Sequence, residues 1–272
     1  MSSYTHYQYV LVKDLGDYVY SVQLNRPKQL NAVNFAEFRE LAEIFTRLDE
    51  DSSCRVILLS GAGRAFSSGI DLQGLDEGLD EARKGRTTRR NLIKLQDAIT
   101  TMEKCCKPVI AVMHGYALGV AIDIASACDI RFCTKDVRFS VKEVAIGLAA
   151  DVGSLNRLPK IVGNHSWLRD LAYSAREFNG PEALQYGLVS RIFDTQEEMM
   201  EEATKFAKHI ASNSPVAVQG TKVVLNYARD HPVDDSLQYV ANWNMSQLHT
   251  DDIAAAVTAT MSKGKKPVFS KL

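Results

Sequence analysis

The stretch Val109-Ile-Ala-Val-Met-His-Gly-Tyr-Ala-Leu-Gly-Val-Ala-Ile-Asp-Ile-Ala-Ser-Ala-Cys128 sets the fold class of this chain. Its first five residues, 109–113, form an unbroken apolar run of the kind that predicts a buried strand. A loop with two glycines follows, and residues 121–128 then show the pattern of an apolar helix. A strand that leads through a short loop into a helix is typical of an α/β fold.

Similar short apolar runs recur on both sides of this stretch. They predict strands at 9–13, 19–24, 56–60, 130–134 and 189–193, with amphipathic segments between them. Asn34-Phe-Ala-Glu37 resembles a capping box and predicts a helix to about residue 49, with Phe35, Phe38, Leu41, Ala42 and Phe45 on one face. Helical patterns at 195–212 and after Ser214-Pro215 predict a helical C-terminal part. We therefore expect an α/β core over residues 1–194 and a helical region over residues 195–272.

The composition excludes several classes of protein. The chain has 272 residues, 46% of them hydrophobic and 24% charged, as in ordinary globular domains. A formal net charge of −1 favours neither nucleic acid nor anionic lipid as a partner. No apolar run reaches the roughly 18 to 20 residues of a membrane-spanning helix. The five cysteines match no zinc or redox spacing, and the six histidines form no constellation, so no metal is expected.

Three glycine-containing loops were candidates for ligand binding. Gly61-Ala-Gly63 lacks the third glycine of a dinucleotide fingerprint, because Phe66 stands there, so no nicotinamide or flavin cofactor is expected. The loops 65–72 and 114–120 each follow a predicted strand, and their small residues allow a ligand close to the backbone. One free N–H from each loop would form an oxyanion hole, whereas the alternative interpretation is two ordinary turns.

Three carboxylates stand out in the otherwise apolar segment 109–159. Asp123, Glu143 and Asp151 are separated by apolar residues, and a buried carboxylate without a partner tends to raise its pKa. Carboxyl groups that cluster also push their pKa values apart, which provides one acid and one base in one site. The alternative is that each acid pairs with a nearby cation, for which Lys142, Arg157 and Lys160 are the candidates.

Several motifs together resemble one known family. The segments Asn25-Arg-Pro-Lys-Gln-Leu-Asn-Ala32, 64–72 and 114–124, in this order and spacing, resemble the crotonase (enoyl-CoA hydratase/isomerase) superfamily. Within it, Asp123, Val141-Lys-Glu-Val144 and Gly147-Leu-Ala-Ala-Asp-Val-Gly153 are most similar to the Δ3,5-Δ2,4-dienoyl-CoA isomerases. The resemblance implies a crotonase-like spiral of ββα units and a helical C-terminal region that builds a homotrimer or a hexamer, a dimer of trimers.

The resemblance also implies a reaction. The substrate would be an acyl-CoA thioester, with coenzyme A as part of the substrate and no separate cofactor. The double bonds of a 3,5-dienoyl-CoA would move to the 2,4 positions, by C2 deprotonation and C6 reprotonation through a dienolate, in β-oxidation of unsaturated fatty acids. Alternatives within the family are a 2-enoyl-CoA hydratase, a Δ3-Δ2-enoyl-CoA isomerase and a non-catalytic acyl-CoA-binding protein.

The resemblance assigns roles to particular residues. Glu143 would serve C2 and Asp151 would serve C6, with Asp123 as a supporting acid. The backbone N–H groups of Ile70 and Val120 would hold the thioester oxygen. Val120 departs from the family's glycine run, and its Cβ narrows the site and disfavours positive φ. The expected substrate and coenzyme A contacts are Arg26, Lys28, Leu30, Ser68, Gly69, Asp71, Leu72, Gln73 and Ala121.

Two further segments carry predictions about location and surface. Ser270-Lys271-Leu272 matches a peroxisomal address read by an import receptor, and predicts delivery to the peroxisomal matrix. The first residues of the chain do not resemble a signal or transit peptide. The basic segment 83–94 is interpreted as a solvated helix face or loop, with phosphate contact or RNA binding as alternatives.

Overall fold

A six-stranded sheet forms the centre of the computed structural model, which describes residues 4–71, 80–262 and 267–272. Its strands lie in the order β1 (Val10–Asp14), β2 (Val19–Leu24), β3 (Val56–Gly61), β4 (Val109–Met113), β6 (Ile130–Thr134) and β8 (Arg191–Phe193). The pair β1–β2 is antiparallel and every other pair is parallel. A second, two-stranded sheet pairs β5 (Tyr116–Leu118) with β7 (Arg138–Ser140) in parallel.

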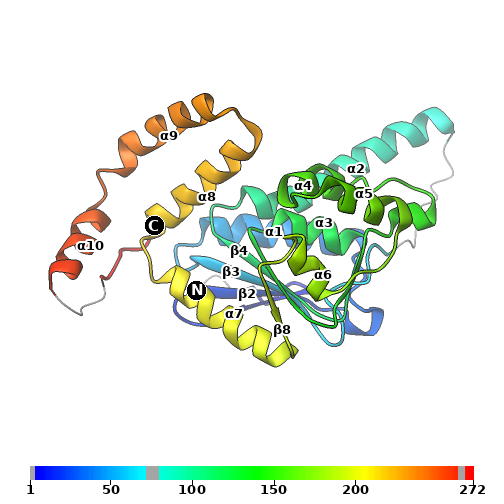
Figure 1. Ribbon diagram of the computed structural model, residues 1–272, viewed down its shortest axis with the longest axis horizontal. Helices are drawn as coiled ribbons and strands as arrows, with labels where there is room; N and C mark the ends of the chain where they lie inside the picture. Colours follow the sequence, from blue (N-terminus) through cyan, green and yellow to red (C-terminus); the bar gives the residue numbers. More distant parts are fainter. Residues whose placement is uncertain (1–3, 72–79, 263–266) are drawn as a thin grey trace.

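The two faces of the six-stranded sheet bury different sets of helices (Figure 1). Because side chains alternate along a strand, Ile57 and Leu59 of β3 belong to one core, whereas Val56 and Leu58 belong to the other. The first core takes in α1 (Phe35–Glu50), α2 (Glu81–Lys104) and α3 (Val120–Ala127). The second core is closed by the small residues and Met199 on one side of α7 (Gln196–Ala211).

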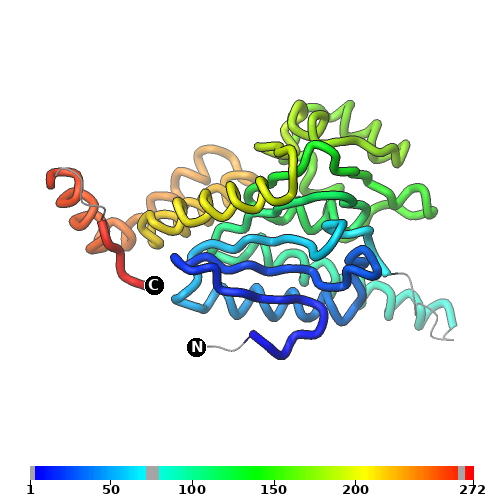
Figure 2. The backbone as a smooth tube through the Cα atoms, turned by 90° about the horizontal axis from the view of Figure 1, so that it is seen from below, coloured from blue at the N-terminus to red at the C-terminus, as the bar shows by residue number. Residues whose placement is uncertain are grey.

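Helix α7 changes the expected division of the chain. Met199, Ala203 and Ala207 pack directly on the sheet, so the cover of the sheet extends to Ala211, past the expected boundary after residue 194. The C-terminal helices that do not cover the sheet begin with α8 (Pro215–Asp230). The side chain of Ser214 caps this helix by accepting a hydrogen bond from the N–H of Ala217. The next helices are α9 (Val233–Gln247) and α10 (Asp251–Met261), which extend away from the sheet in Figure 2.

The strands and several helices lie close to their predicted positions. The first strand begins at Val10 and the last at Arg191, each a residue or two later than expected. The strands β5 and β7 were missed, because three residues inside loops are too few to show a period. The basic segment 83–94 lies on α2, mostly exposed, as a solvated helix face. Between β7 and β8 lie α4 (Ser154–Ile161), α5 (His165–Ser174) and α6 (Gly180–Gln185).

Candidate active site

The loops 65–72 and 114–120 lie side by side at the end of the sheet and are joined by backbone hydrogen bonds. The N–H of Ser67 donates to the carbonyl of Tyr116 at 3.0 Å, and the N–H of Leu118 donates to the carbonyl of Ser67 at 3.1 Å. Gly69 has φ 110°, and a Cβ there would lie 3.2 Å from the carbonyl oxygen of Leu118. The absence of a side chain at Gly69 therefore lets the two loops touch, which brings Ile70 beside the start of α3.

Val120 adopts a conformation that its side chain tolerates. The positive φ in this turn, 54°, falls on Gly119, whereas Val120 is the first residue of α3. The strain expected at Val120 from a positive φ is thus absent, which corrects that expectation. Among the described residues, the N–H groups of Ile70 and Val120 donate no hydrogen bond. Both residues line the same cavity, so two free donors are available there.

Glu143 lies against this turn. It begins the 3-10 helix η2 (Glu143–Ile146), directly after the small sheet. A Cβ on Gly119 would lie 3.2 Å from its Oε1, and its Oε2 is buried without a hydrogen-bond partner in the described part of the chain. Burial is the main cause that raises the pKa of Glu143 to about 7, with a further contribution from Asp123 and Asp151.

Asp123 is the most deeply buried of the three acids. It lies one turn into α3, with 1% of its surface exposed. Its Oδ1 accepts a hydrogen bond of 2.6 Å from the N–H of Ser154, the first residue of α4. Burial raises the pKa of Asp123 to about 6, while this hydrogen bond opposes the rise. A helix N-terminus therefore holds the carboxylate in place of a cation.

Asp151 lies at the start of the turn that leads into α4. Its carbonyl oxygen accepts a hydrogen bond of 2.7 Å from Nε2 of Gln96 on α2. The residue is the most exposed of the three acids, and partial burial raises the pKa of its carboxyl group. Asp151 is thus the acid that exchanges protons with solvent most readily.

One cavity of about 1070 Å³ unites these groups. The amide-bearing residues Ile70 and Val120 and the three acids all line it. Its other walls come mainly from α1, α2 and the segment after η2, and their apolar members are Phe35, Phe38, Ala42, Leu92, Leu95, Ala98, Ile146, Leu148 and Val152. A site of this kind excludes much of the water around a bound chain and strengthens electrostatic interactions.

The alternative cation partners bind elsewhere. Arg157 pairs with Glu103 and Lys160 pairs with Asp230. Within residues 4–71, 80–262 and 267–272, no ion pair joins Asp123, Glu143 or Asp151 to a basic side chain. The three acids are therefore grouped around one cavity without a neutralising partner.

The predicted coenzyme A loop forms a neighbouring cluster and does not line the cavity. The guanidinium of Arg26 pairs with Oδ2 of Asp71 at 3.0 Å and also donates to the carbonyl of Ala32. The N–H of Ser68 donates to the carbonyl of Leu30 at 2.9 Å. The loop around the 3-10 helix η1 (Pro27–Gln29) is therefore tied to the edge of the Ile70 loop.

The remaining predicted contacts differ in position. Lys28 is exposed on η1, which leaves its ammonium group free to meet an anion. Gly69 is buried between the two loops, and Ala121 is buried within α3. Leu72 and Gln73 lie outside the described residues.

Sequence reasoning missed two parts of this site. It missed the wall that Leu92, Leu95 and Ala98 of α2 supply, because only residues 83–94 of this helix were considered, and only for their charges. The signal was present, since these residues recur at helical spacing. It also missed the N–H of Ser154 as the partner of Asp123, because no sequence pattern reports a contact over 31 residues.

Comparison with known proteins places the chain in a family. Residues 15–271 match the model of the enoyl-CoA hydratase/isomerase family, and the chain belongs to it. A relative from Mus musculus named Delta(3,5)-Delta(2,4)-dienoyl-CoA isomerase, mitochondrial, is 49% identical over 98% of this chain and 84% of its own length. A relative from Arabidopsis thaliana named Delta(3,5)-Delta(2,4)-dienoyl-CoA isomerase, peroxisomal, is 43% identical over 97% of this chain and 96% of its own.

The solved structures confirm the crotonase-like α/β fold predicted from the sequence. The crystal structure of an enoyl-CoA hydratase from Bacillus anthracis superposes with a TM-score of 0.88. It is 28% identical and the match covers 96% of this chain and 99% of that one.

Neither a membrane-spanning helix nor a metal-binding cluster occurs among the residues that the structure describes. None of the described helices combines the length and the apolar character needed to cross a bilayer. In the same residues, no three His, Cys, Asp or Glu side chains gather in an arrangement that would hold a metal ion.

Proposed function

We propose that this protein is a Δ3,5-Δ2,4-dienoyl-CoA isomerase of the β-oxidation of unsaturated fatty acids. The observation that carries the proposal is the single cavity, which holds two free backbone N–H groups and two acids of raised pKa, Glu143 and Asp151. The names of the relatives from Mus musculus and Arabidopsis thaliana support the same reaction. Coenzyme A enters as part of the substrate.

The reaction begins at the thioester. Its carbonyl oxygen accepts hydrogen bonds from the N–H groups of Ile70 and Val120, and ionised Glu143 removes a proton from C2. The negative charge spreads from the oxygen to C6 as a dienolate. One oxyanion donor is worth about 2.7–4 kcal/mol in other enzymes, so two donors supply a large part of the lowering of the barrier.

The reaction ends at the far end of the conjugated system. Protonated Asp151 donates a proton to C6, which shifts the double bonds to positions 2 and 4. Because C2 and C6 are several bonds apart, two separate carboxyl groups are needed. Glu143 must then lose its proton and Asp151 must regain one before the next turnover. The exposure of Asp151 allows it to take this proton from solvent. Asp123 contributes a negative charge beside the two other acids. It also fixes the start of α4 by accepting a hydrogen bond from the N–H of Ser154.

A direct assay of both reaction types tests this function. The purified protein is given a 3,5-dienoyl-CoA, and formation of the 2,4-dienoyl thioester is followed by its longer-wavelength absorbance. Hydration of crotonyl-CoA is measured in parallel. We expect rapid isomerisation and slow hydration. Fast hydration without isomerisation would mean a hydratase, and binding without either reaction would mean a non-catalytic acyl-CoA-binding protein.

We also propose that the loop around η1 binds the coenzyme A moiety. Exposed Lys28 offers a positive charge to a phosphate group, and the Arg26–Asp71 pair fixes the loop beside the cavity. The other proposed contacts are Leu30, Ser68, Gly69, Leu72, Gln73 and Ala121. Replacement of Lys28 by Met should raise KM for dienoyl-CoA and leave kcat nearly unchanged, and an unchanged KM would remove Lys28 from the binding surface.

The helices after residue 214 are proposed to build a homotrimer, or a hexamer from two trimers. They expose many large apolar side chains, namely Leu225, Val233, Leu237, Met245, Leu248, Ile253, Val257 and Met261. Exposed large apolar side chains that recur along several helices are typical of an interface between subunits. Light scattering during size-exclusion chromatography tests this, and a monomeric mass would contradict it.

Peroxisomal delivery through Ser270-Lys271-Leu272 is proposed on two observations. The side chains of this tripeptide are exposed, although Nη2 of Arg55 donates to the carbonyl groups of Phe269 and Ser270 at 2.9 and 3.0 Å. The relative from Arabidopsis thaliana is named peroxisomal and the one from Mus musculus mitochondrial. A fluorescent protein that carries residues 261–272 should enter peroxisomes, and a diffuse signal would reject the proposal.

A further inference from the structure

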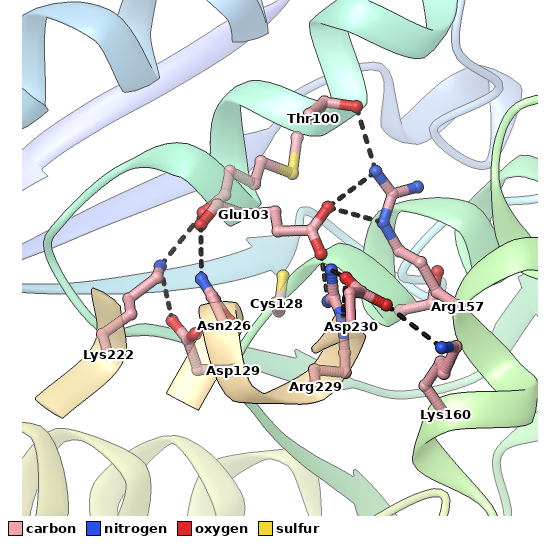
Figure 3. Close-up of polar contacts among 12 residues, drawn as sticks. Thr100, Glu103, Cys128, Asp129, Arg157, Lys160, Lys222, Asn226, Arg229 and Asp230 are labelled. Carbon is pink, nitrogen blue, oxygen red and sulfur yellow. Dashed lines mark hydrogen bonds and ion pairs between the residues drawn. The ribbon is translucent and has the colours of Figure 1, made fainter. Parts of the chain in front are cut away.

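An ionic cluster joins α2, α4 and α8 (Figure 3). Glu103 of α2 is at its centre. Its Oε2 accepts hydrogen bonds from Nε and pairs with Nη2 of Arg157 on α4, at 3.0 and 2.9 Å. Nη2 of Arg157 also donates to Oγ1 of Thr100 at 3.0 Å. Only 11% of the Arg157 side chain and 13% of the Glu103 side chain are exposed, so the pair is well shielded from solvent.

The guanidinium of Arg157 also covers the backbone of Gly153. A Cβ at Gly153 would overlap Nη1 of Arg157, so the arginine occupies the space that any side chain there would need. Gly153 has φ 133°, a conformation that favours glycine. Arg157 therefore packs directly on the short turn 151–154.

This turn carries two parts of the site. Asp151 stands at its beginning, and the N–H of Ser154, which binds Asp123, stands at its end. Glu143 does not belong to it, because Glu143 lies on η2 and packs against Gly119. A shift of the turn would move Asp151 and the partner of Asp123 and leave Glu143 in place.

We propose that Arg157 is a positioning residue for the protonation of C6. Its planar guanidinium binds Glu103 and Thr100 at once while it covers Gly153, which fixes the turn that presents Asp151. A lysine at this position keeps the charge, but its single ammonium group cannot reproduce the forked geometry. The inference rests on the isomerase reaction proposed above.

The same cluster also connects the turn that carries Asp151 to the C-terminal helices. Arg229 of α8 pairs with the other carboxylate oxygen of Glu103, and its neighbour Asp230 pairs with Lys160 of α4 at 3.1 Å. Helix α8 is therefore linked to α4 directly through the Asp230–Lys160 pair and indirectly through Glu103 of α2 (Figure 3). The position of Asp151 depends on the docking of α8, the first helix of the region proposed to form the trimer.

Two rates measured on the same samples test this role. One is isomerisation of 3,5-dienoyl-CoA, which needs both acids, and the other is exchange of the C2 hydrogen with D2O, which needs Glu143 and the oxyanion hole. Asp151→Asn calibrates the assay, because it should abolish isomerisation and retain C2 exchange. If the wild-type protein does not isomerise the substrate, or Asp151→Asn isomerises it normally, the proposed function fails before Arg157 is considered.

Arg157→Lys should lower kcat for isomerisation at least tenfold, with KM and the rate of C2 exchange each within about threefold of wild type. Arg176→Lys is the matched control, since Arg176 also binds two side chains, Asp170 and Glu182, but contacts no part of the cavity. The control should change neither rate. Equal loss of both rates in Arg157→Lys, or loss of neither, overturns the proposal.

A milder variant keeps the proposal testable if Arg157→Lys does not fold. Thr100→Val conserves the shape of the side chain and removes one hydrogen bond to Arg157. We expect a threefold to tenfold fall in isomerisation with C2 exchange retained. Unchanged isomerisation in a folded Thr100→Val protein, together with an unfolded Arg157→Lys, overturns the proposal and leaves the cluster a purely structural role.

Discussion

Glu143 and Glu103 are both at least partly shielded from solvent, but only Glu103 has cationic partners among the described residues. Glu103 lies between the guanidinium groups of Arg157 and Arg229. Glu143 has no cation partner in the described chain, and one of its oxygens has no partner at all. A paired carboxylate fixes the structure around it, whereas burial without a counter-charge raises the pKa of a carboxyl group. Glu103 thus has counter-charges that suit a structural role, whereas Glu143 lines the cavity without one, as suits an acid that transfers a proton.

The largest effect is expected from neutralising the unpaired acids. Glu143→Gln or Asp151→Asn should lower kcat for isomerisation about a thousandfold or more, which is roughly 4 kcal/mol at the barrier. Binding of the acyl-CoA should remain nearly normal, because neither side chain is among the proposed coenzyme A contacts. Steady-state kinetics and calorimetric binding measure the two quantities. Full activity in either variant would exclude that residue from proton transfer.

Neutralising the paired acid should act on stability. Glu103→Gln leaves the buried guanidinium of Arg157 without its carboxylate, whereas Arg229 keeps Asp230, and we expect the free energy of unfolding to fall by about 3 kcal/mol. Glu177→Gln is the control, because its pair with Arg138 is largely exposed and worth less than about 1 kcal/mol. Urea unfolding measures both. The comparison fails if Glu143→Gln destabilises the protein more than Glu103→Gln does.

Glu37 sharpens the comparison, because it is unpaired like Glu143 but does not line the cavity. It is fully buried in α1, neither carboxyl oxygen has a hydrogen-bond partner in the described residues, and burial raises its pKa from 4.5 to about 8. Between pH 4.5 and about pH 8, Glu37 keeps its proton in the folded protein but has lost it in the unfolded chain. The free energy of unfolding therefore falls as pH rises through this range. From pH 6 to pH 8 the loss is about 2 kcal/mol.

Glu37→Gln should remove this part of the pH dependence and leave the smaller part that comes from Glu143. Thermal or urea unfolding of wild type and variant at several pH values in this window measures the difference. A variant that loses stability with pH as steeply as wild type would show that Glu37 is already ionised in the folded protein.

The smallest expected effect is the pH dependence of catalysis. Glu143 must be ionised to accept the C2 proton, so kcat/KM should fall about tenfold per pH unit below its pKa of about 7. Asp151 must be protonated, and its raised pKa extends the active range upward before the rate falls again. Glu177→Gln should leave the profile unchanged. A flat profile between pH 6 and pH 8 would show that Glu143 is not the base.

The sequence predicted those parts of the site that depend on local context. The strand before residue 114 and the glycine turn after it fixed the position of Val120, and the apolar surroundings singled out Asp123, Glu143 and Asp151. These features are visible because each depends on neighbours within a few residues. The grouping of the acids around one cavity depended on the resemblance to a family.

The contacts between distant segments could not be predicted. The Arg157–Glu103 pair joins residues that are 54 positions apart, and nothing in either segment identifies the other. Arg157 was considered as a partner for a cavity acid because it is near in sequence, whereas it points to α2. The conformation of Val120 was also misjudged, because the dihedral angles depend on how Gly119 absorbs the turn.

The contact between Arg55 and the end of the chain has a consequence for how that end is recognised. The guanidinium binds the carbonyl oxygens of Phe269 and Ser270, groups that every amino acid possesses. A substitution of the Ser270 side chain therefore leaves these two hydrogen bonds possible, whereas a substitution at Arg55 removes them and keeps the tripeptide Ser270-Lys271-Leu272 intact. Under the targeting role proposed above, recognition of the side chains and anchoring of the backbone would be separable properties of one short segment, open to independent change by mutation or by selection.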